Sequence, residues 1–171
     1  MPLSDLIAVI PASGKGGRFG QPKALASYEG KAFAEHITST LLESGVDNVI
    51  VAVGYDTPDM LATLRQAIDE QGNTAAKGYL VWPVDHPFVR KDTVLNLIQA
   101  WREQPVAVIR PSHGGQSGHP IIIPAWLDLN ADDGGQGLAG LIRAQACTVI
   151  DVPVEDPNVL RNINYPKDLE N

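Results

Sequence analysis

The chain has 171 residues, 44% of them hydrophobic and 19% charged, which fits one globular domain and excludes a disordered chain. Its net charge of −7 excludes an extended nucleic-acid surface, because such a surface needs clustered Lys and Arg. Cys147 is the single cysteine, so an internal disulfide is impossible and we expect a reducing, cytoplasmic compartment. We find neither a signal-peptide pattern nor a run of roughly 20 apolar residues, so we expect no export and no membrane span.

Apolar patterns along the chain alternate between those of strands and those of helices. The runs Leu6–Ile10 and Val49–Val53 are continuous, which is typical of strands buried on both faces of a parallel sheet. A glycine-rich loop follows the first run, and Gly45 is expected to end the first helix. Thr57 and Pro58 are expected to start the next helix as its cap and first turn. Further strands are expected at 79–84, 106–109, 120–123 and 149–152, and helical segments at 33–41, 61–68, 94–101, 138–144 and 166–170.

Strands that alternate with helices predict an α/β fold. We expect a three-layer α/β/α sandwich around a mostly parallel sheet, in one domain over residues 1–171. Ligands of such folds bind at the carboxyl ends of the strands. The glycine-rich loop follows the first strand and Asp85 ends the third, so both are expected to face one site.

The glycine-rich loop at 11–23 combines several glycines with cations. Glycines let the backbone approach a ligand closely, and consecutive N–H groups can form a concave anion site. Arg18 and Lys23 add donors, each worth about 1.5–3 kcal/mol on a desolvated phosphate. The residues alone also fit a plain glycine-rich turn, or a dinucleotide-binding loop in which Asp56 would hold the ribose. A P-loop does not fit, because no Ser or Thr follows the Gly-Lys pair.

This loop resembles the signature of nucleotidyltransferases with a GT-A-like fold, which reads Ala-Ala-Gly-x-Ser/Gly-x-Arg-Met-Gly-x-Pro-Lys. Here it stands as Ala12-Ser13-Gly14-Lys15-Gly16-Gly17-Arg18-Phe19-Gly20-Gln21-Pro22-Lys23, with mild departures at the second and eighth positions. The family it resembles is the MobA-like NTP transferases. That resemblance implies a Rossmann-like nucleotide-diphospho-sugar transferase fold, and it extends over nearly the whole chain in the family's order.

Three later segments carry the rest of the resemblance. Val84-Asp85-His86-Pro87 is similar to the strand end whose aspartate binds Mg²⁺ in this family, although Asp85 alone could cap a loop and His86 could contact substrate or cap the turn. Mg²⁺ uses one or two carboxylates and takes its other ligands from phosphate and water. Gly118-His119-Pro120 resembles the acceptor side of the molybdopterin cytidylyltransferase branch. Asn162-Ile163-Asn164 resembles the second metal segment, with an Asx turn as the alternative.

One departure from the family concerns the segment after residue 55. The family usually has a further strand and an Asn- and Gly-rich loop before a Ser-Leu helix start, which Ala62-Thr63-Leu64 resembles. Here that segment follows Tyr55–Pro58 almost directly. A strand that normally helps to enclose the base is therefore expected to be shortened or absent.

The resemblance implies in-line attack by an acceptor phosphate on the α-phosphate of a nucleoside triphosphate, with Mg²⁺ as the cofactor and pyrophosphate as the product. Ala12-Ser13 fill space that Gly-Gly leaves open in the guanylyl branch, which favours CTP, and Gly118-His119-Pro120 favours molybdopterin as the acceptor. A molybdoenzyme is the candidate protein partner. The implied residues are Arg18 and Lys23 for catalysis; Ala12, Ser13, Gly14, Gly16, Gly17 and Thr63 for the nucleotide; His86, Gly118 and His119 for the substrate; and Asp85 and Asn164 for the metal.

Three other functions fit the sequence. Pro11–Gly14 also resembles the methylerythritol-phosphate cytidylyltransferases, so the enzyme could be a cytidylyl- or uridylyltransferase that acts on a sugar or polyol phosphate. A degenerate relative could bind a nucleotide or a partner without catalysis, although Arg18, Lys23 and Asp85 argue against it. A small oxidoreductase would bind NAD(P) without Mg²⁺.

Overall fold

The computed structural model describes residues 3–12, 26–53, 57, 59–72 and 75–170. Strands and helices alternate over most of it, as the sequence predicts, except that β1 to β3 and β6 to β8 follow one another without a helix between them. The strands are β1 (Leu6–Ala12), β2 (Ser27–Tyr28), β3 (Lys31–Ala32), β4 (Val49–Val53), β5 (Gly78–Val81), β6 (Val108–His113), β7 (Gln116–Ser117), β8 (Ile121–Pro124) and β9 (Val149–Pro153). The helices are α1 (Phe33–Glu43), α2 (Met60–Gln71), α3 (Lys91–Glu103) and α4 (Gly137–Ala144), with 3₁₀ turns η2 (Pro157–Leu160) and η3 (Pro166–Glu170).

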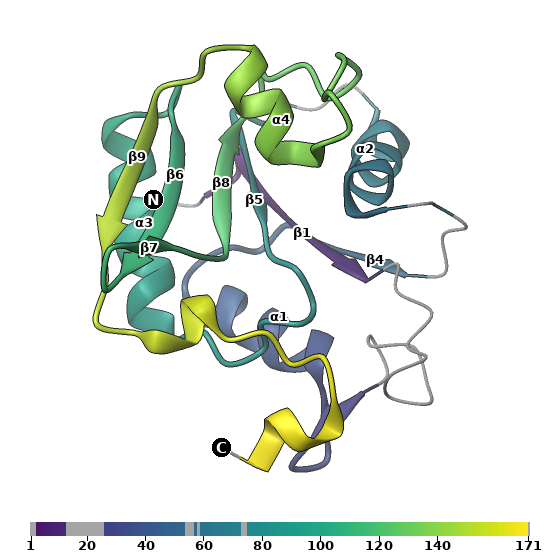
Figure 1. Cartoon of the computed structure of the whole chain (residues 1–171), viewed down its shortest axis with the longest axis vertical. Helices are drawn as coiled ribbons and strands as arrows, with labels where there is room; N and C mark the ends of the chain where they lie inside the picture. The colour runs from purple at the N-terminus through teal and green to yellow at the C-terminus, as the bar shows by residue number, and fades with distance from the viewer. Residues whose placement is uncertain (1–2, 13–25, 54–56, 58, 73–74, 171) are drawn as a thin grey trace.

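Seven strands form one sheet in the order β4-β1-β5-β8-β6-β7, and β9 pairs with β6 (Figure 1). The pairs β1–β4, β1–β5 and β6–β9 are parallel. β8 runs antiparallel to both β5 and β6, and β7 forms a hairpin with β6. The mostly parallel α/β sheet is therefore confirmed, with two antiparallel strands in it.

Helices cover both faces of the sheet, and the alternation of side chains along β1 shows how. Leu6, Ala8 and Ile10 face a core built with α1 and α3, whereas Ile7 and Val9 face a core built with α2 and α4. Every residue of β1 is buried, because the strand lies inside the sheet with a partner on each side. This is the sandwich that the sequence predicts.

The prediction that β4 is buried on both faces is wrong. β4 pairs only with β1 and forms an edge of the sheet. Val51 and Val53 are accordingly exposed, and only Ala52 is fully buried. A continuous apolar run cannot distinguish an edge strand from a central one, because both read as Val and Ile.

The predicted start of α2 is also wrong by two residues. Asp59, not Thr57, is the N-cap, since its carboxylate accepts a hydrogen bond from the Ala62 N–H at 2.8 Å. Thr and Asp are both common caps, so the sequence allowed either. Between β4 and this helix, the part of the chain that the structure describes contains no further strand. None of the described helices is long and apolar enough to cross a membrane.

Candidate functional site

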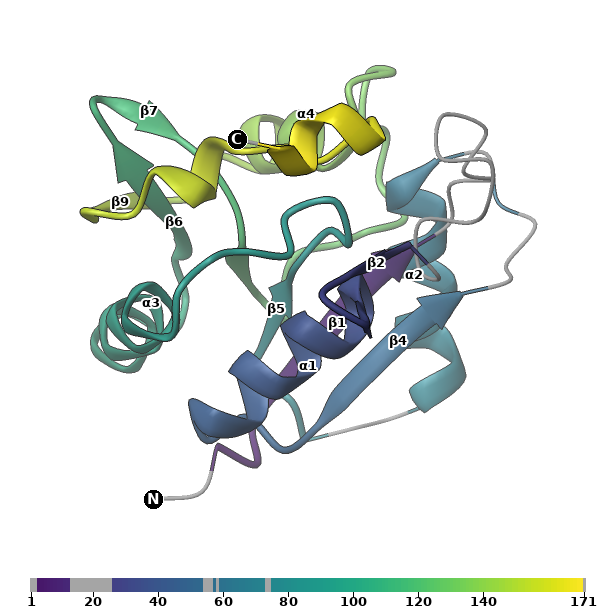
Figure 2. The same ribbon diagram turned by 90° about the horizontal axis from the view of Figure 1, so that it is seen from below.

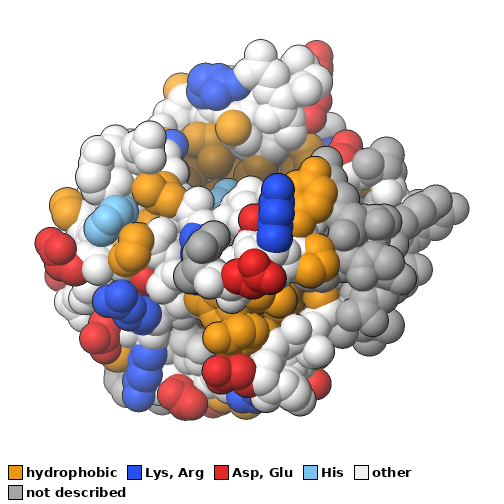
Figure 3. Space-filling view, turned by 60° about the horizontal axis from the view of Figure 1, so that its bottom comes forward, with side chains coloured by type: hydrophobic (Ala, Val, Ile, Leu, Met, Phe, Trp, Pro, Cys, Tyr) orange, Lys and Arg blue, Asp and Glu red, His pale blue; other side chains and the backbone are white. Residues whose placement is uncertain are grey.

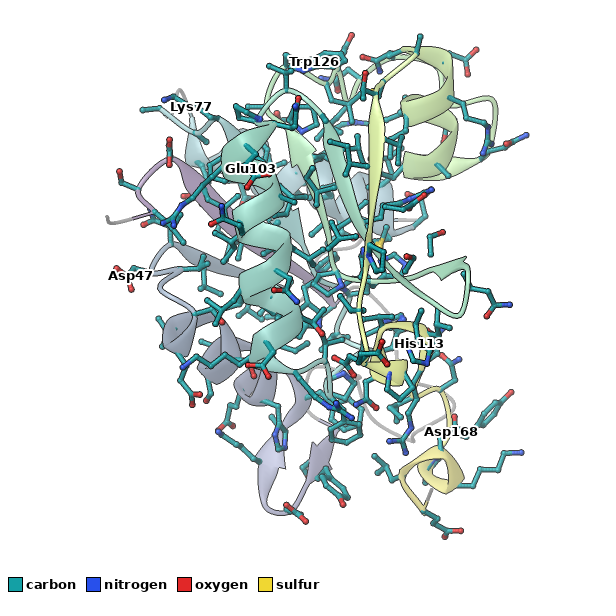
Figure 4. All side chains as sticks on the ribbon, turned by 90° about the vertical axis from the view of Figure 1, so that its left-hand side faces the viewer. Asp47, Lys77, Glu103, His113, Trp126 and Asp168 are labelled. Atoms are coloured by element: carbon teal, nitrogen blue, oxygen red, sulfur yellow. The ribbon has the colours of Figure 1, made fainter. Side chains whose placement is uncertain are left out.

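The carboxyl ends of the parallel strands define the edge at which the candidate site lies. Figure 2 looks on to this edge and shows the segment after β9 running across it. In Figure 3 the same region carries a hollow with hydrophobic side chains at its floor and a histidine beside it. Figure 4 shows His113 and Asp168 toward this end of the molecule and Lys77 and Trp126 at the other.

Asp85 lies beyond the end of β5 rather than directly at it. After Val81 the chain stays beside β1, because the Trp82 N–H donates to the Val9 carbonyl and the Val84 N–H to the Pro11 carbonyl. The strand thus continues as an extended segment that brings Asp85 to the carboxyl end of β1. The Asp85 side chain is 23% exposed and so can reach a ligand.

His86 holds the Asp85 carboxylate in place. Its Nδ1 lies 2.8 Å from Asp85 Oδ1, and because an ionised carboxylate only accepts, this Nδ1 carries the proton. The Trp82 indole in turn donates to the His86 carbonyl at 2.8 Å. His86 is only 4% exposed, so its observed role is to orient Asp85, and a substrate contact stays a prediction.

His119 packs against His86, with the two ring centroids 4.8 Å apart. Burial lowers the pKa of His119 to about 4, and a positive charge on His86 would lower it further, while Asp85 acts in the opposite direction. The ring is therefore neutral near pH 7. Its Nδ1 is a buried atom that has no hydrogen-bond partner among the described residues.

Gly118 is required for packing against the C-terminal part of the chain. A Cβ at this position would lie 2.1 Å from the Val159 carbonyl oxygen, which is impossible without movement of the backbone. The same carbonyl accepts a hydrogen bond from the His119 N–H at 2.9 Å. The predicted Gly118-His119 segment is thus fixed to η2, and both residues line the cavity described below.

Asn164 lies in a turn that is tied to the Asp85 loop. The N–H of Ile163, a fully buried residue, donates to the Asp85 carbonyl at 2.8 Å. The Asp168 carboxylate accepts from the N–H groups of Asn164 and Tyr165, both at 2.9 Å, and these bonds lower its pKa. The structure therefore brings the two predicted metal-ligand segments together, while Asp168 acts as the cap of the turn.

The donor types of the two predicted ligands, Asp85 and Asn164, fit a magnesium ion. One carboxylate and one amide oxygen are the hard ligands that Mg²⁺ takes from a protein when phosphate oxygens and water supply the rest. Among the described residues, no three His, Cys, Asp or Glu side chains are arranged so that they could hold a metal ion together, so these residues form no closed metal cage of the structural zinc type.

A cavity of about 830 Å³ opens beside His119, between β6, β8, β9 and the first turns of α2 and α4. Its floor is aliphatic, and two arginines stand at its wall. Arg110 pairs with Asp151 through two hydrogen bonds, of 2.8 and 3.1 Å, and Arg143 donates to the Gln136 side chain. The floor residues are Leu61, Ile121, Leu138, Ile142 and Val149.

Sequence reasoning missed the rim of this cavity. The rim is the segment 131–137, in which Asp133 accepts hydrogen bonds from the Gly135 and Gly137 N–H groups, and these lower the pKa of the carboxyl. The signal was present as Asp-Asp-Gly-Gly-Gln-Gly before a helix, a pattern of turn residues and caps. Arg110 and Arg143 carry no such pattern, because they come from separate elements.

Two predicted nucleotide contacts lie in the described part of the chain. Ala12 is buried at the end of β1. Thr63 is fully buried, and its hydroxyl donates to the Asp59 carbonyl at 3.0 Å and lies 2.5 Å from the Thr57 hydroxyl. These contacts support the start of α2, and a nucleotide contact by Thr63 stays a prediction. The remaining loop residues, Ser13, Gly14, Gly16, Gly17, Arg18 and Lys23, lie outside the described residues.

Comparison with known families identifies the family of this chain. The profile of the MobA-like NTP transferase domain matches residues 8–149, which include most of β1, Asp85 and the residues that line the cavity. The chain belongs to the MobA-like NTP transferase family. Members of this family are nucleotidyltransferases, which implies an enzyme that uses a nucleoside triphosphate and a phosphorylated acceptor.

One relative of this MobA-like chain is named for guanylyl transfer. The chain is 22% identical over 192 aligned positions to a probable molybdenum cofactor guanylyltransferase of Rhodopirellula baltica, covering 96% of this chain and 90% of the relative. The alignment is longer than the chain, so the relative carries insertions.

Solved structures share the fold of this MobA-like chain at low sequence identity. Rv0371c from Mycobacterium tuberculosis H37Rv superposes with a TM-score of 0.78 at 19% identity, over 99% of this chain and 97% of that one. A manganese complex of the same protein gives 0.75 at 19%, over 97% and 96%. The 2-C-methyl-D-erythritol 4-phosphate cytidylyltransferase of Thermus thermophilus gives 0.72 at 18%, over 97% and 96%.

Proposed function

We propose that this enzyme transfers CMP from CTP to a phosphorylated acceptor, with Mg²⁺ as its metal and molybdopterin as the first candidate acceptor. The observation that carries the proposal is the hydrogen bond from the Ile163 N–H to the Asp85 carbonyl. It holds the Asn164 turn beside Asp85 at the carboxyl edge of the sheet. Asp85 contacts His86, which packs against His119, and His119 lines the cavity.

Asp85 and Asn164 would hold the Mg²⁺ ion. When bound there, the ion supplies charge neutralisation for the phosphate oxygens that are brought together in the reaction. The manganese complex of Rv0371c supports a divalent cation in this fold. His86 fixes the Asp85 carboxylate in one orientation, which is the usual role of a hydrogen bond behind a metal ligand.

No strong general base is needed for this reaction, because the acceptor phosphate is already an anion near neutral pH. Catalysis then rests on positioning and on stabilisation of charge. We assign the triphosphate to the loop Gly14–Gly17, with Arg18 and Lys23 on the charge of the α-phosphate and of the leaving pyrophosphate. His119 stays neutral, so its ring can border the ligand without adding a positive charge close to the proposed Mg²⁺ ion.

The cavity supports an acceptor with a fused-ring body rather than a polyol. A polyol phosphate presents hydroxyl groups that need polar partners when they leave water. The floor of this cavity is aliphatic, and Arg110 and Arg143 at its wall are already bonded to Asp151 and Gln136, so few polar partners remain for hydroxyl groups. The ring body of molybdopterin fits such a lining better than a sugar or polyol does, and its phosphate would extend past His119 toward Asp85.

We assign CTP as the nucleotide because this sequence has Ala12-Ser13 where the guanylyl branch has a Gly-Gly pair, which has no side chains. Guanylyl transfer is the second candidate, and the name of the Rhodopirellula baltica relative favours it. A molybdoenzyme that receives the product is the proposed protein partner, and the cytoplasm is the expected compartment on the basis of the single cysteine.

The direct test is pyrophosphate release with CTP or GTP, Mg²⁺, and either molybdopterin or methylerythritol phosphate. We expect CTP with molybdopterin to give the highest kcat/KM. Asp85→Ala should lower the rate by about 100-fold, since it removes the single carboxylate of the donor set. Asp5→Ala, which removes a surface partner of Lys77, is the matched control and should leave the rate unchanged.

Each result separates one part of the proposal from the rest. A preference for GTP would leave the reaction class intact and reverse the base assignment. A preference for the polyol phosphate would contradict the acceptor assigned to the cavity. Equal rates in wild type and Asp85→Ala would contradict the metal site itself.

A further inference from the structure

The segment 157–168, here called the C-terminal strap, contacts both sides of the candidate site. At its start the Val159 carbonyl accepts from the His119 N–H, on the cavity side. Further along, the Ile163 N–H donates to the Asp85 carbonyl, on the metal side. The strap thus fixes the spacing between the proposed acceptor and metal positions, and Figure 2 shows it crossing the edge of the sheet.

Arg161 joins the strap to the loop that carries Asp85. Its guanidinium lies over the Phe88 ring, 5.2 Å from the ring centroid, and Phe88 follows Asp85 by three positions. The Arg161 Nη2 group also donates to the Asp168 carbonyl at 2.6 Å. Asp168 in turn caps the turn that contains Asn164. One side chain therefore contacts the loop of the first proposed ligand and the cap of the second.

Phe88 gives Arg161 a rigid platform. The ring packs edge-on against Tyr28 at 5.1 Å and against Phe33 at 6.4 Å, so it is held by β2 and by the start of α1. A cation over a held aromatic face is attracted to it and loses little freedom there. Movement of the Asn164 turn away from Asp85 would have to break the hydrogen bond from the Ile163 N–H to the Asp85 carbonyl and, in addition, either the Phe88 contact or the Asp168 contact of Arg161.

We propose that Arg161 is a positioning residue for the metal site, holding the Asn164 turn against the Asp85 loop through Phe88 and Asp168. This inference rests on the proposed function, because it assigns a role toward the proposed Mg²⁺ ligands. In this role Arg161 touches neither the substrate nor the metal. Groups that orient metal ligands typically change metal affinity by about 10- to 100-fold when they are removed.

The test compares Arg161→Ala with Arg65→Ala. Arg65 is a matched control, because it also donates to a backbone carbonyl, that of Leu129, at 2.9 and 2.5 Å, but lies on α2 away from Asp85. Binding of Mn²⁺ is measured by the electron paramagnetic resonance of free Mn²⁺ in the presence of a non-hydrolysable CTP analogue. We expect about 10-fold weaker Mn²⁺ binding in Arg161→Ala and wild-type binding in Arg65→Ala.

Two further measurements separate positioning from a loss of folding. The Mg²⁺ concentration for half-maximal rate should rise in Arg161→Ala while kcat at saturating Mg²⁺ stays near the wild-type value. Arg161→Lys, which keeps a cation and a donor, should recover part of the affinity. If Arg161→Ala does not fold, Phe88→Leu, which removes the aromatic face and keeps an apolar side chain, should weaken Mn²⁺ binding in the same direction.

Wild-type Mn²⁺ affinity in a folded Arg161→Ala would overturn the positioning role and leave the proposed function standing. An equal loss of Mn²⁺ affinity in Arg65→Ala would also overturn the positioning role, because removal of any such arginine would then weaken Mn²⁺ binding. A wild-type enzyme that binds no Mn²⁺ with the analogue would instead contradict the proposed metal site, and the inference with it.

Discussion

Two loops border the candidate site, and they are held in different ways. The metal-side loop, residues 82–90, has internal contacts such as the Trp82 indole to the His86 carbonyl, and it is also held by partners from far along the chain: the Ile163 N–H at the Asp85 carbonyl and the Asp156 carboxylate at the Arg90 N–H. The cavity-rim loop, residues 131–137, is held by its own side chains, since Asp132 and Asp133 accept from the glycines that follow them.

This difference indicates where the enzyme is sensitive to distant change. A loop stabilised by its own turn residues keeps its shape when the rest of the chain shifts. A loop held by long-range partners takes its shape from them, so the C-terminal part of the chain determines the geometry around Asp85. We expect substitutions in that part to affect metal binding and stability more than substitutions in the cavity rim.

Asp156→Ala should have the largest effect on stability. Asp156 is 2% exposed and accepts from the Arg90 N–H and the Thr93 hydroxyl at 2.8 Å, and from the Asn158 N–H at 3.0 Å. Its removal leaves several donors buried without a partner, which we expect to lower the free energy of unfolding by about 3 kcal/mol. Urea denaturation measures this.

The matched control for that prediction is Asp151→Ala, which removes an exposed carboxylate from the ion pair with Arg110. We expect a loss below about 1 kcal/mol, as is usual for exposed pairs. An Asp156→Ala protein that is as stable as this control would contradict the view that long-range partners hold the metal-side loop.

His119 should make the free energy of unfolding fall as the pH is lowered, by less than the loss in Asp156→Ala. Its folded pKa of about 4 lies below its ordinary value of 6.5, so the unfolded chain binds a proton more readily. This contribution is present above pH 6.5 and is lost as the pH falls toward 4. Between pH 7 and 5 we expect wild type to lose about 2 kcal/mol more stability than His119→Gln does. Parallel stability curves for the two proteins would show that the ring is not held neutral.

Asp133→Ala should have the smallest effect. The variant removes a local cap from the cavity-rim loop, and its other turn contacts, such as the Gly134 N–H to Asp132, remain. We expect the melting temperature to fall by about 2–4 °C, with no change in the Mg²⁺ dependence of the rate. Scanning calorimetry and a Mg²⁺ titration check this, and a shift in Mg²⁺ dependence would show that the two loops are coupled.

The sequence predicts those features that depend on local pattern. The buried run Leu6–Ile10 indicated β1, and the spacing of Val94, Ile98 and Trp101 indicated α3. Asp85 was found because a family motif places an aspartate there. The cap of α2 was missed because Thr57 and Asp59 are equally acceptable caps by type.

Features that depend on long-range contacts could not be predicted in this way. Nothing in its neighbours shows that Asp156 holds the start of α3, 66 positions away from the Arg90 N–H that it binds. The cavity joins residues of several separate elements, and no single segment carries its pattern. The need for glycine at Gly118 comes from Val159, which approaches it only in the folded chain.

The most direct test of this account is a crystal structure of the enzyme with Mn²⁺ and a non-hydrolysable CTP analogue, with the metal located by its anomalous scattering. The account predicts Mn²⁺ in contact with the Asp85 carboxylate and the Asn164 amide oxygen, and bridged to the phosphates of the analogue. Mn²⁺ bound elsewhere, such as between Asp59 and Asp133 at the cavity, would contradict it.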